Sequence, residues 1–356
     1  MVCRRLALAS RFIAAGFSDG SVMVFHSGGS RDCIFSVKPT HEIIIGPHSR
    51  AISGLFIEEG ELNQVMFASM DGSLFEGVIT ARGIAGGERG GYRRVMVGNY
   101  VNDGILVDFT GDSDRWVGLY VGVNGRSLHI WDASTHDLIF NGGNMTDPDA
   151  YHGWHLLVDN VNQYIGRVEI VSQATKVIVV ATRSRLCVMD MEHFTMLFDI
   201  PSHFLVMPFD DDHILCPTLS SCRNFASLVL KSGIAILIEI GTSTLQPHVR
   251  HFDASRILTP YRNINNESDE VDGADDNNDD DDDGVMCVNG AMNSRHLFLC
   301  CNGVIHVWEY RSCVHLYGLS NPTNIANVTD LVANDRFVAC CSKDIEGIHL
   351  WDFSGY

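Results

Sequence analysis

The chain has 356 residues, of which 46% are apolar, and no apolar run approaches the ~20 residues that a membrane-spanning helix needs. Its 33 glycines, together with many valines, isoleucines and phenylalanines, favour a β-rich protein over a helical bundle. The formal charge is −19, but eleven of the carboxylates lie between Glu267 and Asp283, and the remaining charge of −8 argues against direct binding of nucleic acid, because such binding needs a clustered basic face.

Repeats along the chain are its most informative feature. Each copy has an apolar strand, a tight polar turn and a strand in which apolar and polar residues alternate. The copies lie at residues 12–25, 65–77, 116–132, 177–190, 227–240, 296–309 and 336–352. A four-stranded antiparallel sheet cannot bury both faces alone, so successive units must pack face to face around an axis. The repeats predict an all-β fold in which residues 1–356 form a single seven-bladed β-propeller.

The first repeat decides how the N-terminal residues are interpreted. Residues 4–10 superficially resemble a secretion signal, but Arg11 interrupts the apolar stretch and the segment fits the innermost strand of blade one. Gly16–Gly20 matches the G-x-S-x-G pattern of a nucleophile elbow, which requires a helix after the turn. An alternating strand follows here instead. The sequence therefore predicts a hairpin turn and no catalytic serine.

Connections around the second, third and fourth repeats carry the candidate binding residues. Loops at the rim of a propeller surround a shallow central funnel, which suits a peptide or a folded protein partner. Turn formation alone would also explain residues 102–104 and 146–148, and the indole of Trp154 could equally belong to the core. An exposed tryptophan is a typical interface hot spot, so Trp154 is the strongest candidate. The predicted protein-binding residues are Arg50, Asn102, Asp103, Asp147, Trp154 and His155.

An acidic segment separates the fifth and sixth repeats. Residues 263–284 contain almost no apolar side chains, and the eleven carboxylates from Glu267 to Asp283 have no lysine or arginine between them. Such a segment cannot offset the entropy cost of ordering, so we expect a disordered insertion between blades five and six. Its aspartates imitate the start of a calcium loop, but Gly290 occupies the position of the bidentate glutamate.

Three repeats end in a His-x-Trp sequence, which places an aromatic at the same position of each blade. The tryptophans, which we expect to be buried between strands, are Trp131, Trp308 and Trp351. The histidines at 129, 306 and 349 occupy equivalent positions on different blades, so they cannot converge on one zinc ion. Eleven cysteines without a C-x-x-C pair indicate small buried hydrophobes in a reducing compartment. We expect no metal, no cofactor and no catalytic site.

The seventh repeat has room for only three strands, at 327–333, 336–342 and 347–353. The chain stops soon afterwards, and residues 4–10 are already assigned to blade one. We therefore expect the last blade to be three-stranded, with an outer edge whose backbone groups invite aggregation.

The ends HIWD, HVWE and HLWD resemble WD40 repeats. In that family a Gly-His pair, a turn aspartate and the terminal tryptophan form a hydrogen-bonded staple in each blade. His48 and Asp71 match two of these roles in blade two, where Gly77 replaces the tryptophan.

More specific blocks resemble the STERILE APETALA family of plant floral regulators. These blocks are residues 16–22, 67–72, 101–111, 115–132 and 142–157. The resemblance implies an F-box that docks on the Skp1 adaptor of a cullin-type ubiquitin ligase, followed by a propeller that captures the protein to be degraded. It also implies a nuclear setting and control of flower and organ growth.

The sequence departs from that pattern in one respect, because no F-box-like segment precedes blade one. We therefore expect Skp1 and cullin as partners only if an F-box is encoded upstream, and the chain itself to be an incomplete functional unit. The alternative hypothesis is a nuclear WD40 scaffold that assembles transcriptional co-regulators without any link to ubiquitin. Both hypotheses describe a non-enzymatic protein that binds other proteins, with no direct nucleic-acid or membrane partner.

Overall fold

The computed structural model describes the strands of the chain and many of the turns between them. The described residues are 2–26, 41–44, 50–59, 63–80, 83–85, 92–96, 105–122, 125–142, 166–171, 177–182, 185–201, 218–222, 225–229, 234–239, 248–253, 287–301, 303–319, 328–342 and 347–353. The predicted acidic insertion at 263–284 lies outside them. Within these residues, no helix is both long and apolar enough to cross a bilayer.

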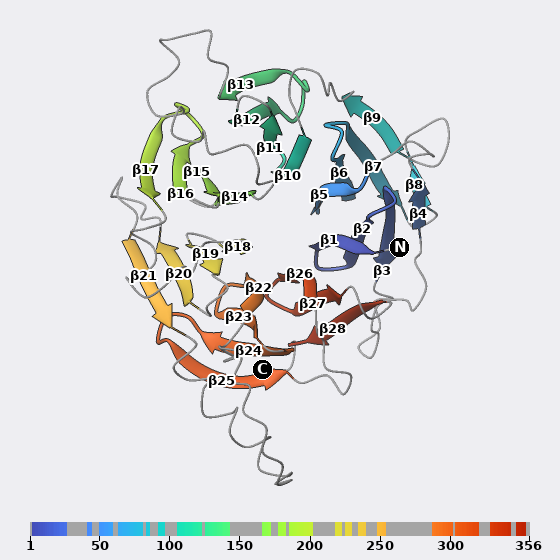
Figure 1. The fold of residues 1–356 in the computed structure, drawn as a ribbon. Coiled ribbons are helices and arrows are strands. Elements are labelled where there is room, and N and C mark those ends of the chain that lie inside the picture. The colour runs from blue at the N-terminus through green and yellow to red at the C-terminus, as the bar shows by residue number, and fades with distance from the viewer. Residues whose placement is uncertain are drawn as a thin grey trace, which may run out of the picture.

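Seven antiparallel sheets follow one another along the chain and around a common centre (Figure 1). Blade one contains β1 (Cys3–Leu8), β2 (Phe12–Phe17), β3 (Ser21–His26) and β4 (His41–Ile44). Blade two contains β5 (Ile52–Glu58), β6 (Asn63–Ser69), β7 (Leu74–Thr80), β8 (Gly83–Ala85) and β9 (Tyr92–Met96). Blade three contains β10 (Ile105–Gly111), β11 (Arg115–Gly122), β12 (Gly125–Asp132) and β13 (Leu138–Gly142).

The remaining blades repeat the same order of strands. Blade four contains β14 (Gly166–Val171), β15 (Val177–Thr182), β16 (Arg185–Asp190) and β17 (Met196–Pro201). Blade five contains β18 (Thr218–Cys222), β19 (Phe225–Val229), β20 (Ile234–Glu239) and β21 (His248–Asp253). Blade six contains β22 (Cys287–Met292), β23 (His296–Cys301), β24 (Val304–Glu309) and β25 (Val314–Leu319). Blade seven contains β26 (Val328–Ala333), β27 (Phe337–Ser342) and β28 (Ile348–Asp352).

The innermost strands close the ring. Each of β1, β5, β10, β14, β18, β22 and β26 contacts the innermost strand of the next blade, and β26 returns to β1. These seven strands surround the centre of the propeller (Figure 1). The predicted all-β, seven-bladed propeller is therefore confirmed.

Two blades depart from four strands. In blade two, β8 pairs with the end of β7 at 78–80, while β9 pairs with its beginning at 74–77, so two short strands share the outermost position. In blade seven the described residues form three strands, as the sequence predicts.

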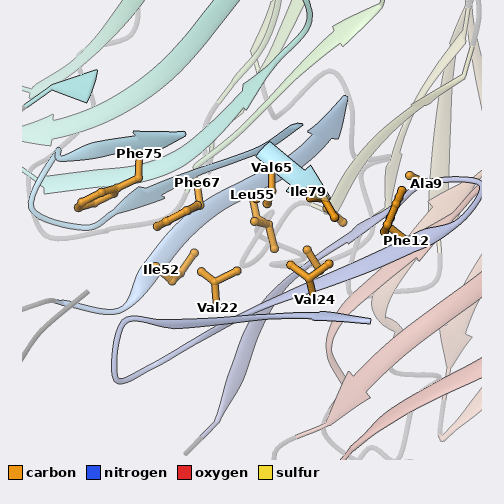
Figure 2. Packing of buried hydrophobic residues seen from close by; sticks show 12 residues of the cluster. Ala9, Phe12, Val22, Val24, Ile52, Leu55, Val65, Phe67, Phe75 and Ile79 are labelled. Carbon is orange, nitrogen blue, oxygen red and sulfur yellow. The ribbon is translucent and has the colours of Figure 1, made fainter. Parts of the chain in front are cut away.

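Apolar side chains pack between neighbouring blades rather than within one sheet. Phe12, Val22 and Val24 of blade one meet Ile52 and Phe67 of blade two in one buried cluster (Figure 2). All five side chains are at most 5% exposed. Period-2 alternation produces this arrangement, because each strand then presents apolar residues to both neighbouring blades.

Two of the three predicted core tryptophans are buried. Trp131 is 3% exposed and Trp308 is fully buried. Trp351 is only partly buried, so the prediction of a largely buried side chain is wrong there. The physical reason is that β28 is the last described strand of its sheet, and no described strand covers its outer edge.

Most cysteines behave as small buried hydrophobes. Among the described residues, the free cysteines Cys3, Cys187, Cys300, Cys340 and Cys341 are buried, and Cys313 is exposed. Cys301 is disulfide-bonded, which departs from the expectation of uniformly reduced cysteines.

A chain of hydrogen bonds links the turns that follow the innermost strands of adjacent blades. Asn293 Nδ2 of blade six donates to the Asn334 carbonyl of blade seven at 3.0 Å, and Asn334 Nδ2 donates to the Ala9 carbonyl of blade one at 3.2 Å. Ser10 Oγ of blade one donates to the Glu59 carboxylate of blade two at 2.7 Å. These contacts fix blades six, seven, one and two in register.

Gly54 allows a close approach between the innermost strands of blades two and three. A Cβ added to Gly54 would lie 2.3 Å from the Cβ of Phe109 and 2.5 Å from its carbonyl oxygen. We expect Gly54→Ala to lower the free energy of unfolding by ~2–3 kcal/mol, because the obstacle is backbone and cannot rotate away. Chemical denaturation measures this loss. Gly318→Ala is the matched control, since its added Cβ would meet a side-chain methyl of Val304 at 3.0 Å and should cost far less.

Candidate protein-binding face

One end of the propeller is defined by where the innermost strands begin. Strands one and three of each blade run in the same direction, so the turn between strands two and three lies at that same end. We call this end the start face. β5, β10 and β14 begin there, directly after the segments that carry the predicted binding residues.

Hairpin turns of blades one and two form part of the start face. Asp19 Oδ1 accepts hydrogen bonds from the Ser21 amide at 3.0 Å and the Ser21 hydroxyl at 2.7 Å, and Asp71 Oδ1 accepts the Ser73 amide at 2.8 Å. Gly20 and Gly72 take φ angles of 84° and 80°, a left-handed conformation that favours glycine. The hairpin interpretation of 16–20 is confirmed, because the strand β3 follows at Ser21.

Of the six predicted binding residues, Arg50 lies within the described part of the chain. Its side chain is exposed directly before β5, and its carbonyl accepts a hydrogen bond from Ser69 Oγ at 3.2 Å. The neighbouring Met70 amide donates to the Ala51 carbonyl at 3.0 Å, and the Leu106 amide of blade three donates to the Met70 carbonyl at 3.2 Å. The backbone at Arg50 and Ala51 is thus bonded to Ser69 and Met70 of its own blade, and Met70 is bonded in turn to the next blade.

The other five predicted residues lie outside the described part of the chain. They are Asn102, Asp103, Asp147, Trp154 and His155. His48, which matches part of the WD40 staple, also lies outside it. Their assignment to a binding site stays a prediction.

Arg5 is a residue near the centre of the ring that the sequence argument missed. Its Nε donates to the Ser53 carbonyl of blade two at 2.6 Å, and its Nη2 donates to the Val107 carbonyl of blade three at 3.2 Å. The same Nη2 lies 3.3 Å from Asp108 Oδ1, and the two side chains are 17% and 9% exposed. Arg5 therefore holds three consecutive blades together. The sequence signal that could have found this contact is the presence of an arginine, Arg5, and an aspartate, Asp108, in strands with many apolar residues.

Asp132, at the end of the His-x-Trp strand β12, stabilises a turn at the opposite face. Asp132 Oδ1 accepts the Ser134 hydroxyl at 2.6 Å and the amides of Ser134 and Thr135 at 3.0 and 3.1 Å. The hydrogen bond from the Ser134 hydroxyl and those from the two amides lower the pKa of Asp132. This aspartate is a turn cap, so we do not place it in a binding surface.

A pair of histidines occupies the outer half of blade six. His306 Nδ1 lies 3.2 Å from Nε2 of His315, and His306 is only 9% exposed. Burial lowers the pKa of His306 to about 4, and the neighbouring His315 contributes to the shift. Burial also lowers the pKa of His315. No group of three or more His, Cys, Asp or Glu side chains suited to a metal ion occurs in the described ranges.

These lowered pKa values predict loss of stability in acid. The unfolded chain binds protons near pH 6.5 while folded His306 stays neutral until about pH 4, so the free energy of unfolding falls as pH drops through that window. We expect His306→Gln to remove ~2–3 kcal/mol of this pH dependence, measured by urea unfolding at pH 7 and pH 4.5. His193→Gln is the control. The Asp190 carboxylate raises the pKa of His193, so its removal cannot flatten the acid loss.

A closed ring of antiparallel sheets with His-x-Trp strand ends defines a β-propeller of the WD40 type. No protein-family model matches the chain. Among solved structures, the β-propeller domain of Cps50 (Swd1) from Myceliophteria thermophila is similar, with a TM-score of 0.59 and 12% identity over 99% of this chain and 96% of that one. That likeness supports the fold.

The chain is also 31% identical over 358 residues to "Transcriptional regulator STERILE APETALA" of Arabidopsis thaliana. The alignment covers 99% of this chain and 68% of that protein. The chain therefore belongs to the STERILE APETALA family.

Proposed function

We propose that the chain is a non-enzymatic, protein-binding propeller that captures its partner on the start face. The exposed Arg50, whose carbonyl accepts a hydrogen bond from the Ser69 hydroxyl of blade two, is the observation that carries this proposal. A rigid scaffold that presents exposed side chains at strand ends binds with little ordering cost. The single nucleophile-like motif of the chain, at 16–20, is a hairpin turn, which favours binding over catalysis.

The relative's name, a transcriptional regulator, supports a regulatory role for the chain. We further propose that this role is exercised in the nucleus, in flower and organ development. Within that role we favour the substrate-recognition part of an F-box type ubiquitin ligase, with Skp1 and cullin as partners only if an F-box is encoded upstream. A second candidate is a scaffold for transcriptional co-regulators, which the word "transcriptional" in the relative's name favours.

Co-purification from plant tissue separates the two candidates. Recovery of Skp1 and cullin with the full-length gene product supports the ligase, whereas recovery of co-repressor subunits without Skp1 supports the scaffold. A fluorescent fusion tests the nuclear location, and exclusion from the nucleus contradicts both candidates.

Arg50→Ala tests the start face itself. We expect this variant to bind the co-purified partner at least ~5-fold more weakly, with a free energy of unfolding within ~1 kcal/mol of the parent protein. Arg295→Ala is the matched control, because Arg295 is an exposed arginine in the turn between β22 and β23, at the opposite face. Binding by calorimetry decides the matter. Equal loss in both variants, or in neither, contradicts the start face as the binding surface, and Trp154→Ala extends the test.

A further inference from the structure

The seam between blade one and blade seven joins the two ends of the chain. At its polar side, Asp330 Oδ2 of β26 accepts the buried Leu6 amide of β1 at 2.7 Å. At its apolar side, one cluster contains Cys3, Leu6, Ile13, Ala15, Phe337, Ala339 and Cys341. Two of these residues are cysteines from opposite sides of the seam, Cys3 in β1 and Cys341 in β27.

Thr329 brings the two cysteines together. Its hydroxyl donates to the Cys3 carbonyl at 2.9 Å and lies 3.1 Å from the sulfur of Cys341. The neighbouring Cys341 side chain, together with burial, raises the pKa of Cys3. Cys3 is 7% exposed and Cys341 is fully buried.

We propose that Cys3 and Cys341 are an oxidisable pair, and that a disulfide oxidant such as oxidised glutathione converts them into a disulfide across the seam. The seam is closed in the present structure by non-covalent contacts, and both thiols are free. A bond from β1 to β27 would join the first and last blades covalently. This modification is independent of the function proposed above.

The chemistry begins when the seam opens transiently, because a buried thiol with a raised pKa is unreactive. Cys3 loses its proton to water, and its thiolate attacks one sulfur of oxidised glutathione. The glutathione S–S bond breaks and one glutathione leaves as a thiol after taking up a proton. Cys341 then loses its proton to water, and its thiolate attacks the Cys3 sulfur of the mixed disulfide, so that the second glutathione leaves in the same way. Two electrons pass from the two cysteines to one oxidised glutathione.

A second cysteine pair provides an internal comparison. Cys300 of blade six and Cys340 of blade seven share another buried cluster, and both are fully buried. Their blades are consecutive in the chain, so a bond between them would not join the two ends of the ring. Cys3 retains more exposure than either, and it lies on the first strand of the chain. We therefore expect oxidation to reach Cys3 first.

The test is to incubate the whole chain with oxidised glutathione at neutral pH and to map disulfides by mass spectrometry of a non-reduced digest. We expect a peptide that links Cys3 to Cys341, together with a rise of the melting temperature on the order of 5 °C that dithiothreitol reverses. Cys3→Ala should lose both signals, whereas Cys300→Ala should keep them.

Three results would overturn the proposal. They are the absence of a Cys3–Cys341 link, a link from Cys3 or Cys341 to another cysteine or to glutathione alone, and an unchanged melting temperature after the link has formed. Mapping uses the unaltered chain, so the answer does not depend on whether the alanine variants fold.

Discussion

Replacing Trp308 by alanine is expected to lower the free energy of unfolding by ~3–5 kcal/mol. The indole is fully buried in a cluster with Val229 and Leu237 of blade five and Leu297 of its own blade. The His315 ring covers it from β25, with the ring centres 4.5 Å apart. Removal of the indole leaves a cavity between two sheets whose strands are fixed by their ladders, so the site cannot collapse to fill it.

Trp351→Ala is the matched control for this prediction. Trp351 occupies the equivalent position of blade seven but is only partly buried, so its loss should cost about 1–2 kcal/mol. Urea unfolding of both variants measures the difference. Equal losses of free energy of unfolding in the two variants would contradict burial between blades as the source of the stability that Trp308 provides.

The propeller was predictable because its signals are local. Alternation of apolar and polar residues along short strands, with a turn at 18–20 or 70–72, specifies antiparallel hairpins wherever it occurs. Seven copies of such a unit leave few arrangements other than a ring. The innermost position of β1 followed from the same argument, because the repeat pattern begins at that strand.

Contacts between blades were not predictable in the same way. Asn334 pairs with Ala9 across the seam, and Glu59 supplies the carboxylate that accepts hydrogen bonds from the Ser10 hydroxyl and the Arg11 amide. At the equivalent position of blades six and seven an asparagine caps its own turn, whereas blade one has alanine. In blade one, Glu59 of the neighbouring blade accepts the hydrogen bonds instead. This contact joins residues far apart in the chain, and no pattern within one repeat reveals it.

The binding site was less predictable than the fold. Arg50 emerged because it lies in a connection between repeats, and the structure places its side chain at the surface. Connections carry no periodicity, so residue type and position were the only signals for the remaining candidates.

Arg5→Met is expected to lower the free energy of unfolding by ~3–5 kcal/mol, although Arg5 lies in the first strand of the chain. The guanidinium donates to Ser53 of blade two and to Val107 of blade three, and it pairs with the largely buried Asp108. Methionine keeps most of the volume of the side chain but supplies none of these donors. The variant therefore leaves Asp108 charged at a site from which its guanidinium partner has gone.

Arg4→Met is the matched control for Arg5→Met. Arg4 is the adjacent residue of β1 and its side chain is exposed, so its replacement should change the free energy of unfolding by less than ~0.5 kcal/mol. Thermal and urea unfolding of both variants should separate them clearly. Similar costs for Arg4 and Arg5 would assign the effect to net charge instead of to the contacts between blades.

A double variant locates the origin of the loss. In an Arg5→Met background, Asp108→Asn removes the buried charge that the arginine had balanced, so it should recover part of the lost stability. The same Asp108→Asn change in the parent chain should destabilise, because the guanidinium is then the unbalanced group. A change of sign between the two backgrounds is the signature of a direct pair. Additive losses would mean that Arg5 stabilises the fold through its hydrogen bonds to Ser53 and Val107 alone, and that its contact with Asp108 contributes nothing to the free energy of unfolding.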